Sequence, residues 1–274
     1  MYLIERAVTL IRVVPREHFE FKLSSLGRGL FVCGEGRAMT ELLYQTDSYL
    51  REFEATVTEV GELGLALDRT AFYPGGGGQE PDKGLLTWDG VEHPVVALKK
   101  QGDTVWHKAE GEPPAVGTRV AGKLDWEHRY QVMRTHTAFH ILCGVIWRDY
   151  KASVTGGNMG ALEGRMDFEF EHMTKDLVQE IEARINAEVE AAREVRVAIL
   201  PREEAFQIPD LIRTKINLLP PQITEVRTVE IVGLDLQADG GTHVANTREV
   251  GPIRITDYQS KGKINKRIKI ALEA

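Results

Sequence analysis

The chain has 274 residues, of which 34 are Lys or Arg and 41 are Asp or Glu, so its formal net charge is −7. A hydrophobic content of 42% and a charged content of 27% are typical of a globular protein and exclude collagen-like, coiled-coil and wholly disordered chains. Two cysteines cannot build a disulfide framework, which favours the reducing cytoplasm, and no apolar run reaches the roughly 20 residues of a membrane helix.

Residues 1–38 differ from the rest of the chain in charge, with six basic and four acidic residues. They end in Gly34-Glu35-Gly36, shortly before Met39. Gly-Glu-Gly is the in-frame reading of a purine-rich ribosome-binding sequence, so we hypothesise that translation starts at Met39 and that 1–38 is a doubtful extension. A genuine N-terminal hairpin or helix is the alternative.

Short strands are predicted between Glu52 and Trp126, separated by Gly, Pro and Asp-Gly turn signals. They cover Phe53–Val60, Gly64–Tyr73, Gly84–Trp88, Pro94–Leu98 and Arg119–Leu124. Many short strands without helical periodicity predict a small β-barrel domain over 39–127.

Four consecutive glycines, Gly75–Gly78, follow one of these strands. They could let the backbone approach a substrate or bind a phosphate, which makes Gly76, Gly77 and Gln79 candidate substrate-binding residues. A flexible loop is the alternative. No GxxxxGK[ST] signature is present, so an ATPase of the P-loop class is excluded.

The second half of the chain changes to helical periodicity near Tyr130. Apolar spacing predicts helices over 128–149 and about 175–194, the second capped by Thr174. Glycines from Gly156 are expected to break the chain before the first of the remaining strands, which are Gly164–Phe170, Val195–Leu200, Glu225–Leu236 and a hairpin over Gly251–Leu272. The predicted fold class is α+β, with an α+β domain over 128–274 after the β-barrel domain.

Two histidines on the first helix, His136 and His140, are four residues apart and therefore share one face. Asp239 and His243 flank a glycine pair that lets the backbone turn tightly. Together they form a His-His-Asp-His set suited to Zn²⁺. Cys143 competes with Asp239 for the fourth position, or is simply a small buried residue. No glutamate stands beside the histidine pair, so a metallopeptidase is excluded.

Polar side chains near these histidines in sequence, Thr137, Thr155 and Asn158, are further substrate-binding candidates or ordinary turn and helix-surface residues. The C-terminal hairpin carries a set of basic residues with no acidic residue between Tyr258 and Ala271: Lys261, Lys263, Lys266, Arg267 and Lys269. On an acidic protein such a patch could bind a phosphate backbone, or it could protect a strand edge from aggregation.

The motifs together resemble the alanyl-tRNA editing domain. They are His136-Thr-Ala-Phe-His140, Gly240-Gly-Thr-His243-Val, Phe72-Tyr-Pro-Gly-Gly-Gly-Gly-Gln79 and Gly164-Arg-Met-Asp-Phe168. The stretch from about Met39 to Ala274 is similar to the free-standing AlaX editing proteins of the medium-length type. That resemblance implies a β-barrel with a glycine-rich motif, an α+β zinc domain, and hydrolysis of mischarged Ser-tRNA(Ala), with Gly-tRNA(Ala) as a second candidate substrate and Ala-tRNA(Ala) spared.

The resemblance also implies site residues. His136, His140 and His243 match the zinc ligands, and Thr155 falls where the family has its pocket threonine. Asp239 stands where many relatives have cysteine, so Asp239, Cys143 or a water molecule could be the fourth ligand. The zinc would either activate the attacking water or hold the α-amino group of the substrate.

A non-catalytic protein that binds tRNA or the ribosome and keeps a structural zinc is the alternative function. The sequence leaves open whether the chain acts as a monomer or as a homodimer.

Overall fold

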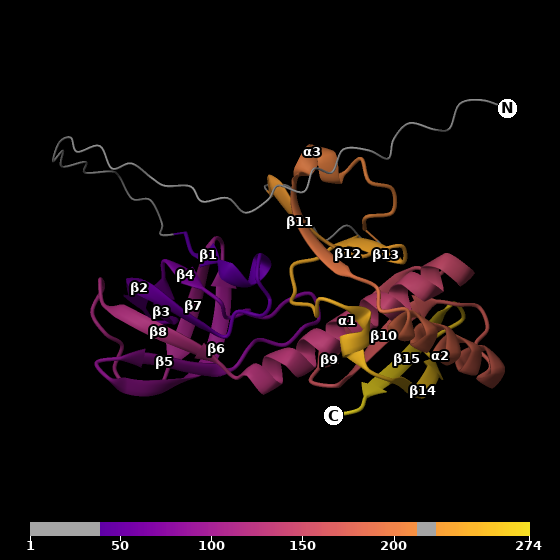
Figure 1. The fold of residues 1–274 in the computed structure, drawn as a ribbon, viewed down its shortest axis with the longest axis horizontal. Coiled ribbons are helices and arrows are strands. Elements are labelled where there is room, and N and C mark those ends of the chain that lie inside the picture. Colours follow the sequence, from indigo (N-terminus) through magenta and orange to yellow (C-terminus); the bar gives the residue numbers. More distant parts are fainter. Residues whose placement is uncertain (1–38, 213–222) are drawn as a thin grey trace. The chain divides into compact units, whose positions relative to one another are not determined.

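The computed structural model describes residues 39–212 and 223–274 (Figure 1). The hypothesis about the translation start concerns residues 1–38, which lie outside the described residues. Within the described ranges no helix is both long enough and apolar enough to cross a membrane.

A closed six-stranded barrel forms the first part of the fold, in the order β2-β3-β7-β6-β5-β8. Its strands are β2 (Glu52–Gly61), β3 (Gly64–Leu67), β5 (Gly84–Trp88), β6 (Val91–Gln101), β7 (Thr104–Ala109) and β8 (Arg119–Leu124). Buried and exposed residues alternate along β8, as expected where one strand face lines a core and the other meets water. Two short strands, β1 (Glu41–Leu42) and β4 (Arg69–Thr70), pair in parallel beside a 3-10 turn, η1 (Leu43–Gln45).

The sequence therefore predicted the barrel correctly but missed part of it. β7 was not predicted, and β6 is longer than the predicted Pro94–Leu98, because it pairs with β5 at one end and with β7 at the other. The predicted strand Gly64–Tyr73 is divided into β3 and β4. The mixed α+β fold class is confirmed, whereas the domain boundaries 39–127 and 128–274 stay a prediction.

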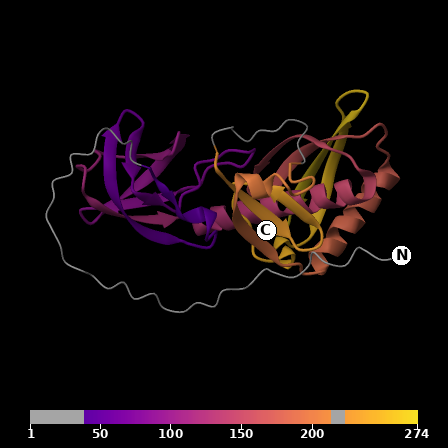
Figure 2. The ribbon, with the colours of Figure 1, turned by 90° about the horizontal axis from the view of Figure 1, so that it is seen from above.

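The long helix α1 (Trp126–Tyr150) follows the barrel directly. The carboxylate of Asp125 accepts a hydrogen bond from the backbone N–H of His128 and caps the helix N-terminus. At the other end, Lys151 adopts a left-handed conformation with φ 55° and stops the helix. α2 (Lys175–Glu190) begins at Thr174, whose side chain caps it as predicted, and lies beside α1 in both views (Figure 1 and Figure 2).

Two sheets complete the fold. The first has four strands in the order β14 (Ile253–Ser260), β15 (Asn265–Leu272), β10 (Glu163–Glu169) and β9 (Val154–Gly160). The second has three, in the order β11 (Val195–Pro201), β12 (Glu225–Ile231) and β13 (Asp235–Ala238). α3 (Arg202–Ala205) follows β11, and a second 3-10 turn, η2 (Thr247–Val250), precedes β14.

Two predictions in this region were wrong. Glycines at 156 and 157 do not break the chain but lie inside β9, where they pair with Asp167 and Met166 of β10. The predicted strand Glu225–Leu236 is in fact split by a turn at Gly233, which has φ 75°. The glycines of this sheet leave room for α1, since a Cβ at Gly164 would lie 2.6 Å from a ring carbon of Phe139.

The core of this half forms where α1 and α2 pack against the sheets. Its buried members include residues of α1, α2, β10 and β15: Ile141, Leu142, Val145, Ile146, Ile181, Ile185, Phe168, Ile268 and Ile270. Full burial of side chains of this size stabilises the fold by about 1.5–3 kcal/mol each relative to exposure. This packing fixes α1 and thereby the histidines that it carries.

A buried ion pair connects α1 to the segment between β4 and β5. Arg129, on the first turns of α1, donates from Nε to Asp82 at 2.8 Å, and both side chains are almost completely buried. Asp82 also accepts the backbone N–H of Tyr73 at 2.5 Å, which closes the base of the glycine-rich loop between these residues. The loop is thus anchored to the helix that carries the histidine pair.

Candidate metal centre

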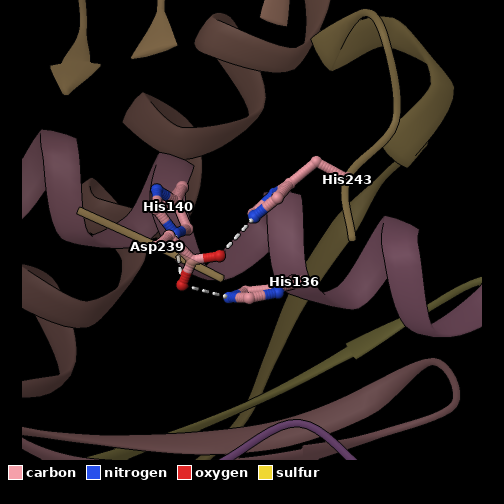
Figure 3. A group of neighbouring side chains, drawn as sticks. All are labelled: His136, His140, Asp239 and His243. Carbon is pink, nitrogen blue, oxygen red and sulfur yellow. Dashed lines mark hydrogen bonds and ion pairs between the residues drawn. The ribbon is translucent and has the colours of Figure 1, made fainter. Parts of the chain in front are cut away.

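Three histidines and one aspartate converge beside α1 (Figure 3). His136 and His140 come from α1, and Asp239 and His243 come from the loop after β13. The candidate ligand atoms of all four residues lie within 4.8 Å of one another. The Nε2 atom of each imidazole faces the Asp239 carboxylate, at 3.4 Å for His136, 3.9 Å for His140 and 3.1 Å for His243.

The glycine pair of the loop permits this convergence. Asp239 accepts a hydrogen bond from the backbone N–H of Gly241 at 2.7 Å, which turns the chain back toward α1. A Cβ at Gly241 would lie 2.4 Å from both Gln79 Oε1 and the His136 ring. Only glycine therefore allows the loop to pass this close to the helix.

A second layer of hydrogen bonds holds the other nitrogen of each ring. The Nδ1 partners are Gln79 Oε1 at 2.8 Å for His136, Asp235 Oδ2 at 3.0 Å for His140, and Thr137 Oγ1 at 3.2 Å for His243. An acceptor at Nδ1 places the proton there and leaves the Nε2 lone pair free to bind a metal. The hydrogen bonds at Nδ1 thus hold all three rings in the orientation of metal ligands, with Nε2 toward Asp239.

The charges of the cluster fit the same role. Burial opposes protonation of His140, but hydrogen bonds to Asp235 and Asp239 outweigh it and raise the pKa of His140 to about 9. Burial would raise the pKa of Asp239, yet the three neighbouring imidazoles hold it well below its usual range. Burial and the proximity of His136 keep the pKa of His243 well below its usual value. Asp239 is thus an ionised carboxylate and His243 a neutral imidazole, the forms that coordinate metals, whereas His140 must release a proton when a metal binds.

The group could hold one metal ion, and three imidazole nitrogens with one carboxylate oxygen suit Zn²⁺. Cys143 is buried on the next turn of α1, and its sulfur accepts a hydrogen bond from Gln237 at 3.3 Å. It does not belong to the group of candidate ligands found among the described residues. Of the protein side chains considered for the fourth position, Asp239 is therefore the one that lies with the histidines.

A cavity of about 790 Å³ opens beside the cluster and is lined by His136, His140 and Asp239. Its apolar wall is formed by side chains of α1, β9 and β10: Phe139, Val154, Met159 and Met166. The volume is in the range that accommodates a small organic ligand.

The cavity wall includes two of the six predicted substrate-binding residues, Thr155 and Gly77. Thr155 is exposed, and its hydroxyl donates to Asn265 Oδ1 at 2.8 Å. Gly76 and Asn158 instead line a neighbouring groove. Thr137 is fully buried behind His243, where its hydroxyl oxygen also accepts the Val244 backbone N–H.

Gln79, a predicted substrate-binding residue, lies against the metal centre. Its side chain is buried and bonds to His136 and to both the side chain and backbone of Thr242. The glycine-rich loop is also fixed on β9, since the Gly78 carbonyl accepts the Met159 backbone N–H at 2.9 Å. The loop is thus a defined wall of the site rather than a flexible segment.

The basic hairpin is less available than its sequence indicated. Lys266 is buried and donates to the carbonyl oxygens of Gly262 and Lys263 at 2.9 and 3.0 Å. Arg267 makes two hydrogen bonds to Asp167 of β10, which lower the pKa of that carboxyl. Lys261 and Lys263 remain exposed. Lys269 forms an ion pair with Asp257 at 2.9 Å, so Lys261 and Lys263 near the turn are the members of the predicted basic set that are most available to a partner.

Two basic residues of the cavity wall were missed by sequence reasoning. Lys100, an exposed residue of β6, and Arg227, a buried residue of β12, both line the cavity. Neither belongs to a recognisable motif, and only the tertiary fold brings them to the cavity.

Comparison with known protein families gives two matches. Residues 38–128 match the model of class II (A) tRNA synthetases, and residues 226–269 match the second additional domain of threonyl and alanyl tRNA synthetases. The chain is 40% identical over 233 residues to the alanyl-tRNA editing protein AlaX-M of Saccharolobus solfataricus, covering 84% of this chain and 98% of that protein. A protein of the same name from Methanosarcina mazei is 40% identical over 243 residues, covering 85% and 97%.

The alanine–tRNA ligase of Pyrococcus furiosus is 38% identical over 220 residues. The match covers 79% of this chain but only 24% of the ligase. The similarity to the ligase is thus confined to one part of that longer protein.

Proposed function

Because the chain belongs to the AlaX-M family of alanyl-tRNA editing proteins, we propose that it is a zinc-dependent deacylase that hydrolyses mischarged Ser-tRNA(Ala). The single observation that carries this proposal is the convergence of three oriented imidazoles and an ionised carboxylate beside a cavity that His136, His140 and Asp239 line. The bond to be cleaved is an activated ester, so one polarising group and one water molecule suffice for hydrolysis.

His136, His140, His243 and Asp239 would hold the zinc. When bound, zinc supplies a Lewis acid that either activates water or holds the α-amino group of the substrate. The contribution of the protein is to fix the ligands before the metal arrives. The hydrogen bond between Gln79 and His136 serves this purpose. The hydrogen bonds of Asp235 with His140 and of Thr137 with His243 do the same for the other two rings.

Selectivity for serine requires a polar partner in the cavity. A site for alanine cannot strongly exclude serine or glycine, but a second site that bonds the serine hydroxyl can reject alanine, because its polar groups would stay unpaired. Thr155 is our candidate, since its hydroxyl lies in the cavity wall and can still accept a hydrogen bond while donating to Asn265. Gly-tRNA(Ala) is a second candidate substrate.

The remainder of the tRNA would contact exposed basic residues. Lys100 lies in the cavity wall, and Lys261 and Lys263 lie at the hairpin turn. Each is suited to a backbone phosphate, which contributes affinity without sequence specificity. Such a partner is met in the cytoplasm, as expected from the cysteine content.

Deacylation of purified tRNA tests the proposal. The zinc-loaded chain is incubated with Ser-tRNA(Ala), Gly-tRNA(Ala) and Ala-tRNA(Ala), and release of the amino acid is followed against buffer. We expect rapid release of serine, slow release of alanine, and loss of serine release in His243→Ala. Binding of tRNA by zinc-loaded protein with no release above buffer would favour the non-catalytic alternative.

A further inference from the structure

Arg227 is a buried cation whose hydrogen-bonding capacity is only partly used. Its side chain is 4% exposed. Nε donates to the Gln45 carbonyl oxygen at 2.8 Å, and Nη1 donates to the Asp239 carbonyl oxygen at 2.9 Å. Within the described part of the chain, the buried Nη2 atom has no hydrogen-bond partner. A buried donor without a partner is costly and calls for an explanation.

The other deeply buried arginine of the fold shows that such a donor can be satisfied. Arg129 bonds through all three nitrogens, to Asp82, to the Ser48 carbonyl oxygen and to the Ala71 carbonyl oxygen. Arg227 instead makes only a long ion pair with Asp239, whose carboxylate oxygen Oδ1 lies 4.0 Å from Nη1. Burial of an arginine in this fold thus does not by itself leave a donor without a partner, and the unpaired Nη2 of Arg227 needs a separate explanation.

That position is beside the metal centre. Arg227 lines the same cavity as His136, His140 and Asp239, and its bond to the Asp239 backbone fixes the guanidinium to the residue that supplies the carboxylate. The two carbonyl contacts hold the planar fork rigidly, so the remaining N–H groups have one fixed direction. A rigid, water-excluded donor is of most use where negative charge develops during a reaction.

We propose that Arg227 is a catalytic residue whose Nη2 donates a hydrogen bond to the carbonyl oxygen of the scissile ester as that oxygen becomes an oxyanion; this rests on the proposed function. In the step, the oxygen of a water molecule forms a bond to the carbonyl carbon and the π electron pair moves to the carbonyl oxygen. The attacking water loses a proton to solvent or to a basic group. When the oxyanion collapses, the bond to the ribose oxygen breaks, and the ribose leaves as a hydroxyl after taking up a proton.

Two stable analogues separate this role from ordinary substrate binding. Both are RNA hairpins with the acceptor stem of tRNA(Ala), one ending in a 3′-serylamide, the other in the corresponding serine phosphonate. The amide is planar and neutral like the substrate, whereas the phosphonate is tetrahedral and anionic like the oxyanion. A group that acts in the transition state contributes more to binding of the second.

The experiment compares the wild-type chain, Arg227→Met and Arg227→Lys, each with its zinc content and melting temperature measured. Arg196→Met is the matched control, because Arg196 is an exposed residue of the neighbouring strand that pairs with Glu194 at 2.7 Å. We expect Arg227→Met to weaken phosphonate binding about 100-fold and to leave amide binding within about threefold, with zinc retained. Turnover of Ser-tRNA(Ala) should fall in kcat by a similar factor and change little in KM.

Several results would overturn the inference. Equal loss of affinity for both analogues would assign Arg227 to a constant feature of the substrate, such as its terminal phosphate, and loss of zinc in both Arg227 variants would make its role structural. If Arg227→Met still bound the phosphonate more tightly than the amide, by the same factor as the wild-type chain, Arg227 would not be the oxyanion donor, while the proposed function would stand. Failure of the wild-type chain to bind either analogue would instead contradict the proposed function.

Discussion

Replacing Asp235 by asparagine should weaken the metal centre without altering its ligands. Asp235 is buried, and its Oδ2 atom accepts hydrogen bonds from His140 Nδ1 at 3.0 Å and from Gln237 Nε2 at 2.7 Å. Asparagine has the same shape and can still accept from the imidazole, but it has no charge. A carboxylate behind a ligating histidine raises the basicity of the ligand, and its loss typically weakens metal binding about 10- to 100-fold.

The size of the effect should depend on pH, because protons compete with zinc for His140. The pKa of His140 is about 9 in the metal-free protein, so at pH 7 the wild-type chain must release a proton before it binds the metal. Without the Asp235 charge this pKa falls, and the variant is less affected by proton competition at pH 7. The loss of zinc affinity should therefore be fully visible, at about 1.4–2.7 kcal/mol, near pH 9 and smaller at pH 7.

Zinc affinity is measured by competition with a chelating dye at both pH values. Asp257→Asn is the control, since Asp257 is a half-buried residue whose ion pair with Lys269 lies in the β14–β15 hairpin. Its affinity should equal that of the wild-type chain. An affinity of Asp235→Asn unchanged at pH 9, or a loss that is larger at pH 7 than at pH 9, would refute the reasoning.

Three further predictions follow from other parts of the fold. Thr155→Val removes a cavity hydroxyl, at a cost of roughly 1–3 kcal/mol, so the ratio of serine to alanine release should fall about 5- to 150-fold; an unchanged ratio would exclude Thr155 as the discriminator. Lys263→Ala should lower the salt dependence of tRNA binding by about one phosphate contact, whereas Lys266→Ala should not, because that amine already bonds within the hairpin; equal slopes for Lys263→Ala and the wild-type chain would contradict this. Burial lowers the pKa of His107 to about 4, so the unfolded chain binds a proton between pH 6.5 and 4 that the folded chain does not, and stability falls as pH decreases across this range. From pH 7 to pH 4.5, the free energy of unfolding in urea should therefore decrease by about 2.5 kcal/mol more in the wild-type chain than in His107→Gln. Equal decreases in the two chains would show that His107 does not titrate in this way.

The candidate ligands could be identified from sequence because local rules determine their geometry. A spacing of four residues places His136 and His140 on one helix face, and a glycine pair lets Asp239 and His243 approach each other. Helix α1 was predicted within two residues at its N-terminus and one at its C-terminus, since its apolar spacing is regular. These features depend on neighbours in the chain, which a single sequence shows.

The parts that could not be predicted depend on pairing between distant segments. The glycine content around Gly156 predicted a break in the chain, yet Gly156 lies in β9, because β10 pairs with it. The sequence around Arg267 contains no acidic residue, and only the pairing of β15 with β10 places Asp167 beside it. The contact between Gln79 and His136 depends on the docking of the glycine-rich loop on α1, which the sequence does not show. Nothing in the sequence indicates that Arg227 reaches the cavity.

Titration of the metal-free chain with zinc, with serine release from Ser-tRNA(Ala) measured at each point, tests the central claim most directly. If His136, His140, Asp239 and His243 form one zinc site that makes the chain an editing enzyme, release should rise in proportion to zinc and stop rising at about one equivalent per chain. The His136→Ala variant should show no such rise. Release that is already maximal without zinc, or that does not respond to zinc at any ratio, would contradict the account.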